Sequence, residues 1–224
     1  MIKIENVVLP SSEQWKAIIM GCRNPKNSWD KSDSEFNREV KTYFDENDVP
    51  CIDLREFVIG PDDLKLMVKL CNAGADHGKF MRMIPVYIDI IAPLYFWKEF
   101  DSYKVGTVAN SCSTMHKIAD KEFMLDDFSH EQMHDAFRAD LQRLVKLLNI
   151  ARNKFLETGD KRFWWDMIQL LPSSYNQRRT VQLNYAVLRN MYHARKGHKL
   201  DEWRDFCAWM ETLPYSRLIT WDLT

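Results

Sequence analysis

The stretch LNYAVLRNMYHAR, residues 183–195, predicts a helix with two polar side chains on an apolar stripe. At about 100° per residue, Asn184 and Arg195 return to nearly the same face, and Leu188 and Met191 lie between them. A cation near a helix C-terminus is stabilised by the helix dipole, which accounts for Arg195 but not for Asn184. A buried amide without a hydrogen-bonding partner costs about 1–3 kcal/mol. We therefore expect both groups to line one pocket that takes a polar ligand.

Composition and charge limit the class of protein. With 224 residues we expect a single domain over residues 1–224. A formal charge of −1 gives no general field for nucleic acid or a membrane surface, so neither is an expected partner. The five cysteines are scattered and include no C-x-x-C pair, which favours reduced thiols in the cytoplasm over a disulfide framework or a zinc ribbon.

The hydrophobic patterns alternate between helix and strand along the chain. In RMIPVYIDII, residues 82–91, every second residue is Ile or Val, which predicts the clearest strand, and Pro85 indicates an edge or a bulge. Residues 1–8 predict another strand, and residues 24–50 and 103–117 predict loops. Because helices outnumber strands, the class is α+β. We expect helices that start at the capping box Ser11-x-x-Gln14, at Pro61 and at Pro93, and over residues 130–157 and 200–212.

The motif HEQMH, residues 130–134, has the H-E-x-x-H spacing of zinc peptidases. On a helix, this spacing places two imidazoles one turn apart beside a carboxylate that acts as general base. Ser129 has the character of an N-cap, however, so the motif would occupy an exposed helix start where Glu131 complements the dipole. No metal ligand is assigned, and a zinc peptidase is kept as an alternative.

The segment YKVGTVANSCSTMHK, residues 103–117, concentrates hydroxyl and amide groups beside one glycine and Lys104. Such a segment can hold a phosphate through backbone N–H groups and charge-assisted hydrogen bonds. A Ser/Thr turn without a ligand is the alternative. The polar members are Lys104, Thr107, Asn110, Ser111, Ser113 and Thr114.

LLPSSYNQRRTVQLNYAVLRNMYHAR, residues 170–195, resembles the C-terminal half of flavin-dependent thymidylate synthases. That family has an Asn twelve residues after a Pro and an Arg eleven residues after the Asn, and Pro172, Asn184 and Arg195 keep these spacings. KLDEWRDFCAWM, residues 199–210, resembles the segment that follows in the family. PLYFWKEFDSYKVGTVANSCS, residues 93–113, resembles the family's signature region, with Asn110 and Ser113 at its Asn and Ser.

Several positions depart from the family pattern. Ser102, Tyr103 and Lys104 stand where the family has Arg-His-Arg, which leaves one cation of three. Lys replaces the planar fork of Arg only in part. His77 falls at the first His of the family's His-x-Ser/Thr-Pro-x-Glu-His element. The family also has charged residues at five other places, where this chain has Arg82-Met83, Ser111, Met115, Ile168 and Ala186.

The resemblance implies an α+β fold whose central antiparallel sheet is flanked by helices, and a homotetramer. It implies FAD as cofactor, methylenetetrahydrofolate and NADPH as co-substrates, and transfer of a one-carbon unit to C5 of dUMP. Arg195 would be the catalytic residue that faces the pyrimidine, and Ser111 and Ser113 would bind the nucleotide substrate. The contacts with FAD would come from His77, Asn184, Lys104, Tyr103 and Asn110. The second hypothesis is a catalytically degenerate nucleotide-binding or assembly protein on the same fold.

Overall fold

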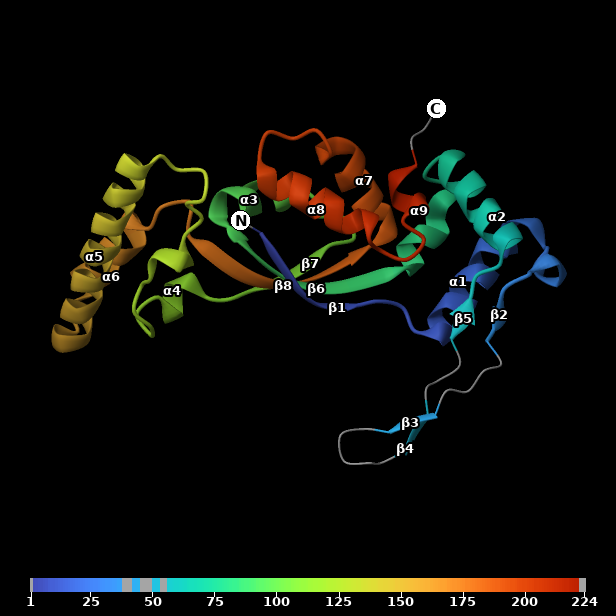
Figure 1. Cartoon of the computed structure of the whole chain (residues 1–224), viewed down its shortest axis with the longest axis horizontal. Coiled ribbons are helices and arrows are strands. Elements are labelled where there is room, and N and C mark those ends of the chain that lie inside the picture. Colours follow the sequence, from blue (N-terminus) through green and yellow to red (C-terminus); the bar gives the residue numbers. More distant parts are fainter. Residues whose placement is uncertain (1, 38–41, 45–49, 53–55, 222–224) are drawn as a thin grey trace. The chain divides into compact units, whose positions relative to one another are not determined.

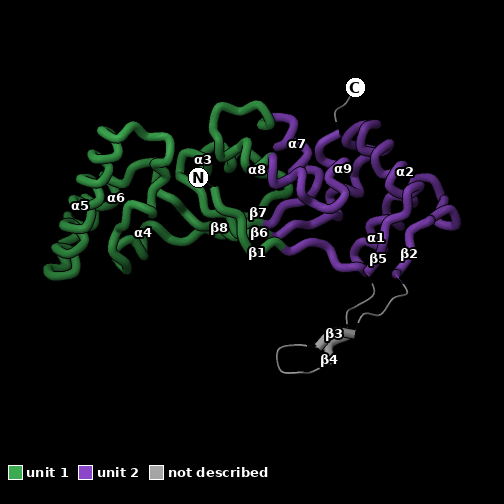
Figure 2. Tube along the Cα trace, viewed as in Figure 1, with its two compact units in different colours: residues 1–7, 88–181, 195–207 green, residues 8–87, 182–194, 208–224 purple. Residues whose placement is uncertain are grey.

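The computed structural model describes residues 2–37, 42–44, 50–52 and 56–221. The chain divides into two compact units, coloured green and purple in Figure 2. Unit 1 holds residues 1–7, 88–181 and 195–207, and unit 2 holds residues 8–87, 182–194 and 208–224. The single domain expected over residues 1–224 stays a prediction.

Four strands form the main sheet, in the order β1-β6-β8-β7 (Figure 1). They are β1 (Lys3–Val8), β6 (Pro85–Pro93), β8 (Asn176–Asn184) and β7 (Val108–Ser111). The sheet is antiparallel and helices accompany it, so the α+β fold class is confirmed. The strand predicted within residues 82–91 is β6, with Val86, Ile88 and Ile90 buried. Pro85 does not mark an edge: β6 lies between two partners, and Pro85 is its first residue, where a proline is tolerated.

The segment over residues 103–117 is more ordered than a loop. It contains β7, whose four residues are all exposed, and the short helix α4 (Thr114–Lys117). The backbone N–H of Cys112 donates to the carbonyl of Arg178 at 2.9 Å, which ties the end of β7 to β8. The loop prediction is therefore wrong here. Polar, exposed residues on an edge strand carry no hydrophobic alternation by which a strand is recognised.

The helices of unit 1 begin with α3 (Leu94–Phe100), which follows Pro93 as expected. Helices α5 (Asp135–Thr158) and α6 (Lys161–Leu170) lie side by side (Figure 1) around a core of their own that includes Leu148 and Met167. Helix α5 starts at Asp135, five residues later than predicted, and His134 is its N-cap residue. Its end at Gly159 is as predicted, with that glycine at φ 68°. Helix α8 (Asp201–Glu211) fulfils the prediction over residues 200–212.

Unit 2 is built mainly from helices. Helix α1 (Ser12–Arg23) starts at the predicted capping box, and α2 (Pro61–Asn72) starts at the predicted proline. Helices α7 (Tyr185–Arg195) and α9 (Arg217–Thr220) follow later in the chain. Part of the loop expected over residues 24–50 lies outside the described residues. The described part contains two 3₁₀ turns, η1 (Asn24–Lys26) and η2 (Trp29–Lys31). It also contributes strands to two antiparallel pairs. Strand β2 (Glu35–Phe36) pairs with β5 (Phe57–Val58), and β3 (Thr42–Phe44) pairs with β4 (Pro50–Ile52).

In the part of the chain that the structure describes, no helix is both long enough and apolar enough to span a bilayer.

Candidate functional site

Asn184 ends strand β8 rather than lying inside a helix. Helix α7 begins at the next residue, and the Asn184 Oδ1 atom accepts a hydrogen bond from the Val187 backbone N–H at 3.1 Å. This is the hydrogen bond of an N-cap, which satisfies one of the backbone donors at the start of a helix. The prediction that residues 183–195 are helical from their first residue is wrong, and so is the stripe that placed Asn184 beside Leu188.

A cavity of about 310 Å³ lies in unit 2 between the segment around His77 and helix α7. On one side it is lined by Gly74, Ala75 and Gly78. His77 itself is exposed, and its backbone N–H donates to the carbonyl of Gly74 at 3.1 Å. On the helix side the lining residues are Ala186, Arg189, Asn190 and His193. The structure therefore brings the neighbours of His77 and the helix capped by Asn184 to one cavity.

The polar rim of this cavity is fixed by contacts within unit 2. Arg189 donates from Nη1 to the carbonyl of Leu218 at 2.9 Å and from Nη2 to Asn72 Oδ1 at 3.2 Å. Cys71 also lines the cavity, and burial raises the pKa of its thiol to about 12, so the thiol is protonated at neutral pH. Met81 and Arg82 complete the lining, and this mixture of apolar and polar groups suits a ring with hydrogen-bonding edges.

Arg195 belongs to unit 1, where three side chains hold its guanidinium. Nε donates to the Tyr103 hydroxyl at 2.9 Å, and Nη1 donates to Glu99 Oε2 at 2.7 Å. The guanidinium carbon lies 4.9 Å from the centre of the Trp203 ring, within the range of a cation–π contact. The structure thus brings together two predicted site residues, Arg195 and Tyr103. Only 21% of the Arg195 side chain is exposed.

Glu99 is the centre of this cluster, and sequence reasoning missed it. Its Oε2 atom also accepts from Trp203 Nε1 at 3.0 Å and lies 3.2 Å from His198 Nε2. Glu99 belongs to α3, one helical turn before Tyr103, and this spacing was the available signal. An open hollow of about 460 Å³ borders the cluster and is lined by Tyr95, Glu99, His198, Lys199 and Leu200.

Among the residues of unit 1 predicted to hold a phosphate, Thr107 and Thr114 are half-buried, and the others, Lys104, Asn110, Ser111 and Ser113, are exposed. Asn110 and Ser111 lie on the edge strand β7, and Lys104 precedes it. The Ser113 Oγ atom accepts from the backbone N–H of His116 at 3.0 Å and so caps helix α4. Among the described residues, the buried Oγ1 atom of Thr107 has no hydrogen-bonding partner. His77 and Asn184 lie in the other unit, so the structure does not place them in this group.

Two further arginines of unit 1 are already paired with carboxylates. Arg178 donates to Asp89 at 2.6 Å and lies 3.4 Å from Glu5. Arg179 donates to Asp101 at 2.6 Å, and its guanidinium carbon lies 4.2 Å from the centre of the Trp97 ring. Like Arg195, these arginines add little net positive charge to their surroundings.

The H-E-x-x-H motif lacks the geometry of a zinc site. His130 precedes helix α5, and its Nδ1 atom lies 2.8 Å from the carbonyl oxygen of Phe128. The two imidazoles of the motif therefore do not share a helical face. In the described ranges, no group of three His, Cys, Asp or Glu side chains is arranged to hold a metal ion.

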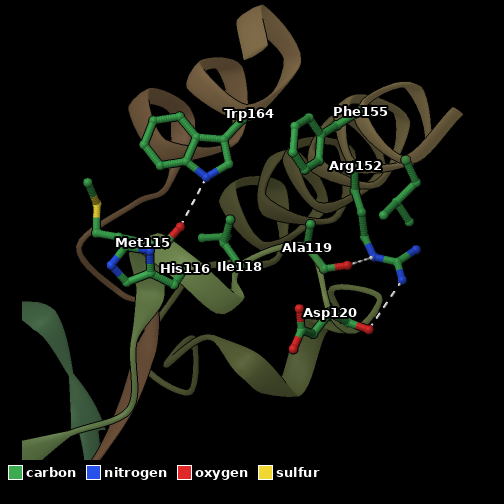
Figure 3. Close-up of a pocket in the computed structure, with 9 residues that line it drawn as sticks. Met115, His116, Ile118, Ala119, Asp120, Arg152, Phe155 and Trp164 are labelled. Atoms are coloured by element: carbon green, nitrogen blue, oxygen red, sulfur yellow. Dashed lines mark hydrogen bonds between the residues drawn. The ribbon is translucent and has the colours of Figure 1, made fainter. Parts of the chain in front are cut away.

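Another hollow, of about 580 Å³, lies where α4 meets α5 and α6 (Figure 3). Two side chains that line it donate hydrogen bonds to backbone carbonyls. Trp164 Nε1 donates to Met115 at 3.0 Å, and Arg152 Nε donates to Ala119 at 2.9 Å. None of the predicted site residues is among the residues that line it.

The fold is that of the flavin-dependent thymidylate synthases. Thymidylate Synthase X (ThyX) from Helicobacter pylori, solved with FAD and dUMP, matches with a TM-score of 0.67 at 15% sequence identity, over 97% of this chain and 94% of that chain. A second structure of ThyX from the same organism, also complexed with FAD and dUMP, gives a TM-score of 0.66 at 14% identity, over 97% and 95% of the two chains. No protein-family model and no curated protein sequence matches the chain.

Proposed function

We propose that the chain is a flavin-dependent thymidylate synthase-like enzyme. It would transfer a one-carbon unit from methylenetetrahydrofolate to C5 of dUMP, using FAD and, as reductant, NADPH. The observation that carries this proposal is the fold match over 97% of the chain to structures solved with FAD and dUMP. When bound and reduced by NADPH, the flavin would supply the two electrons of the reaction.

The cavity of unit 2 supports the flavin side of the proposal. Its lining combines glycine and alanine with the hydrogen-bonded guanidinium of Arg189, and these groups fit a heteroaromatic ring. In this proposal His77 and Asn184 contact the flavin from the loop and from the start of α7. The thiol of Cys71 also lines this cavity, and burial keeps it neutral and poorly nucleophilic.

The groups of unit 1 support the nucleotide side. Arg195 is held in place by side chains of its own chain, so it is pre-organised to face a pyrimidine. Ser111 and Ser113 would bind the nucleotide substrate, and Tyr103, Lys104 and Asn110 would contact FAD. Lys104 and Asn110 are exposed and have the donors that a phosphate requires. We also propose a homotetramer in the cytoplasm, which the buried thiols of Cys22 and Cys207 fit.

A second candidate is a nucleotide-binding or assembly protein that has lost catalysis. The pairing of Arg178, Arg179 and Arg195 with Asp89, Asp101 and Glu99 favours it, because a neutralised guanidinium attracts phosphate weakly. This candidate predicts binding of dUMP or FAD without turnover.

The two candidates are separated by three measurements on the purified full-length protein. The absorbance spectrum after incubation with FAD and gel filtration reports flavin binding. Isothermal titration reports dUMP binding, and release of tritium from [5-³H]dUMP reports replacement of the hydrogen on C5. Flavin binding with tritium release supports the enzyme, whereas binding without release supports the degenerate protein. Absence of both flavin and dUMP binding contradicts both candidates.

The substitution Arg195→Ala should lower tritium release about 100-fold or more, because a donor aimed at the reacting base is lost. Arg179→Ala is the matched control, since Arg179 is also paired with a carboxylate and stacked on a tryptophan of the same unit. The control should keep its activity. Equal activities of the two variants would contradict the role given to Arg195.

A further inference from the structure

The guanidinium of Arg195 is oriented on three sides. Tyr103 accepts from Nε, Glu99 accepts from Nη1, and the Trp203 ring covers one face. Among the described residues, no hydrogen-bond acceptor is paired with Nη2. The side chain therefore presents one nitrogen, in a fixed orientation, to a ligand.

Glu99 also sets the charge of this group. Its carboxylate lies 2.7 Å from the guanidinium, so the pair has no net charge. A phosphate approaching Nη2 would be attracted by the guanidinium and repelled by the carboxylate on Nη1, and the repulsion offsets part of the attraction. A carbonyl oxygen has no net charge and still gains a hydrogen bond from a charged donor. The pair therefore suits a neutral acceptor better than an anion.

We infer that Glu99 is a positioning residue that makes Arg195 selective for a neutral carbonyl oxygen, such as that of a pyrimidine base, over a phosphate. The inference rests on the proposed function in one respect: it takes the ligand of Arg195 to be a pyrimidine nucleotide. Trp203 and His198 share the Glu99 Oε2 atom with Arg195 and so hold the carboxylate itself in place.

The chain offers a matched control for Glu99. Asp101 pairs with Arg179 at 2.6 Å, and Arg179 lies over the ring of Trp97. Both carboxylates come from the end of α3 or the residue that follows it, and both neutralise an arginine that is stacked on a tryptophan. The difference is that no ligand role is assigned to Arg179.

The test compares Glu99→Gln, Glu99→Asp and Asp101→Asn with the wild-type protein. Isothermal titration would measure the affinity for deoxyuridine, which has the base but no phosphate, and for inorganic phosphate, at low and at high salt. Glu99→Gln keeps the shape of the side chain and removes its charge. We expect its affinity for deoxyuridine to fall about tenfold, and its affinity for phosphate to rise and become salt-dependent. Glu99→Asp should recover part of the wild-type selectivity, and Asp101→Asn should match the wild type.

A second measurement does not depend on any ligand. The ¹⁵N signal of Arg195 Nε–H, assigned through its loss in Arg195→Lys, reports whether the guanidinium is held. We expect it to be protected from exchange in the wild type and to broaden or exchange rapidly in Glu99→Gln. If the wild type binds neither dUMP nor deoxyuridine, the proposed function fails, and this signal alone decides whether Glu99 positions Arg195. Unchanged selectivity, or an unchanged Nε–H signal in Glu99→Gln, overturns the inference.

Discussion

The side chain of Asn184 has an oxygen and a nitrogen with separate tasks. The oxygen caps helix α7 through the backbone N–H of Val187. The nitrogen is the group that would donate to a flavin ring under the proposed function. A substitution that keeps the oxygen and replaces the nitrogen can therefore separate the two roles.

The first prediction concerns Asn184→Ala and Asn184→Asp. The alanine variant loses the cap, so its free energy of unfolding should fall by about 0.5–2 kcal/mol. The aspartate variant keeps an acceptor for Val187 and adds a negative charge at the helix N-terminus, so it should unfold at about the wild-type urea concentration. Its affinity for FAD should nevertheless fall, because a carboxylate donates no hydrogen bond.

Urea titration and flavin absorbance measure these two effects on the same samples. If the aspartate variant is stable and binds FAD as tightly as the wild type, Asn184 only caps helix α7 and does not donate to the flavin.

At the residue scale, the sequence showed which side chains needed a partner but not which partner they have. The Asn184 oxygen, for example, accepts from a backbone N–H three residues away, and the predicted helical stripe did not indicate this partner. Arg195 and Tyr103 were singled out, but Glu99 was not, because Glu99 and Arg195 are far apart in the sequence. Contacts between distant residues depend on the tertiary fold, which no local pattern specifies.

Elements with a strong local signal were predicted well. The capping box of α1 is present with both of its hydrogen bonds, and the alternating residues of β6 are buried as expected. Strand β7 was missed because its stability comes from pairing with β8 and not from its own residues. The start of α5 was placed too early because H-E-x-x-H and its flanking serine imitate a helix start.

The second prediction concerns the end of α5. Gly159 has a φ of 68°, and a Cβ at this position would meet no atom within 4 Å. Gly159→Ala should therefore lower the free energy of unfolding by about 1–2 kcal/mol through backbone strain alone.

Gly197→Ala is the control for this effect. A Cβ there also meets no atom within 4 Å, but the backbone is not in the left-handed region, so stability should be equal or slightly higher. Thermal unfolding of both variants tests the pair. Equal losses would contradict backbone strain as the cause at Gly159.

At the scale of the whole molecule, each unit contains a buried carboxylate that accepts hydrogen bonds from several donors. In unit 1, hydrogen bonds from Thr180, Asn6 and Arg178 hold the pKa of Asp89 well below its usual value. In unit 2, burial tends to raise the pKa of Asp63, but hydrogen bonds from Ser32, Ser34 and Arg23 outweigh burial and lower it.

These lowered pKa values make stability depend on pH. Each carboxylate contributes stability above its unfolded pKa, about 3.9, and loses the contribution as the pH falls through the lower folded value. We therefore expect Asp89→Asn to lower the free energy of unfolding by about 1–3 kcal/mol at pH 7. The difference from the wild type should shrink below about pH 4, because the unfolded chain then binds a proton at this carboxyl while the folded carboxylate stays ionised.

Urea titrations at pH 7, 5 and 3.5 measure this difference. Asp140→Asn is the control, because Asp140 is 62% exposed and pairs with Arg143 on the same helix. It should change stability by less than about 0.5 kcal/mol. If the difference in the free energy of unfolding between Asp89→Asn and the wild type stays constant with pH, a lowered pKa of Asp89 is contradicted.

The complete fold was within reach of the sequence only through its resemblance to a family, because spacing around Pro172, Asn184 and Arg195 survives where most identities do not. Strand order and the division into two units have no local signal. Likewise, the resemblance predicts that cations are missing from several positions, but no sequence pattern predicts that Arg178 and Arg195 pair with carboxylates.

Trp203 belongs to two systems at once. It is fully buried among Phe96, Phe100 and Phe206, and the same ring supports the guanidinium of Arg195. Substitutions that improve packing around this ring would therefore also tilt Arg195, and substitutions that retune Arg195 would loosen the packing. Directed evolution for heat resistance and for altered substrate range would compete at this position, so libraries that vary Trp203 and its aromatic neighbours together should outperform libraries that vary them singly.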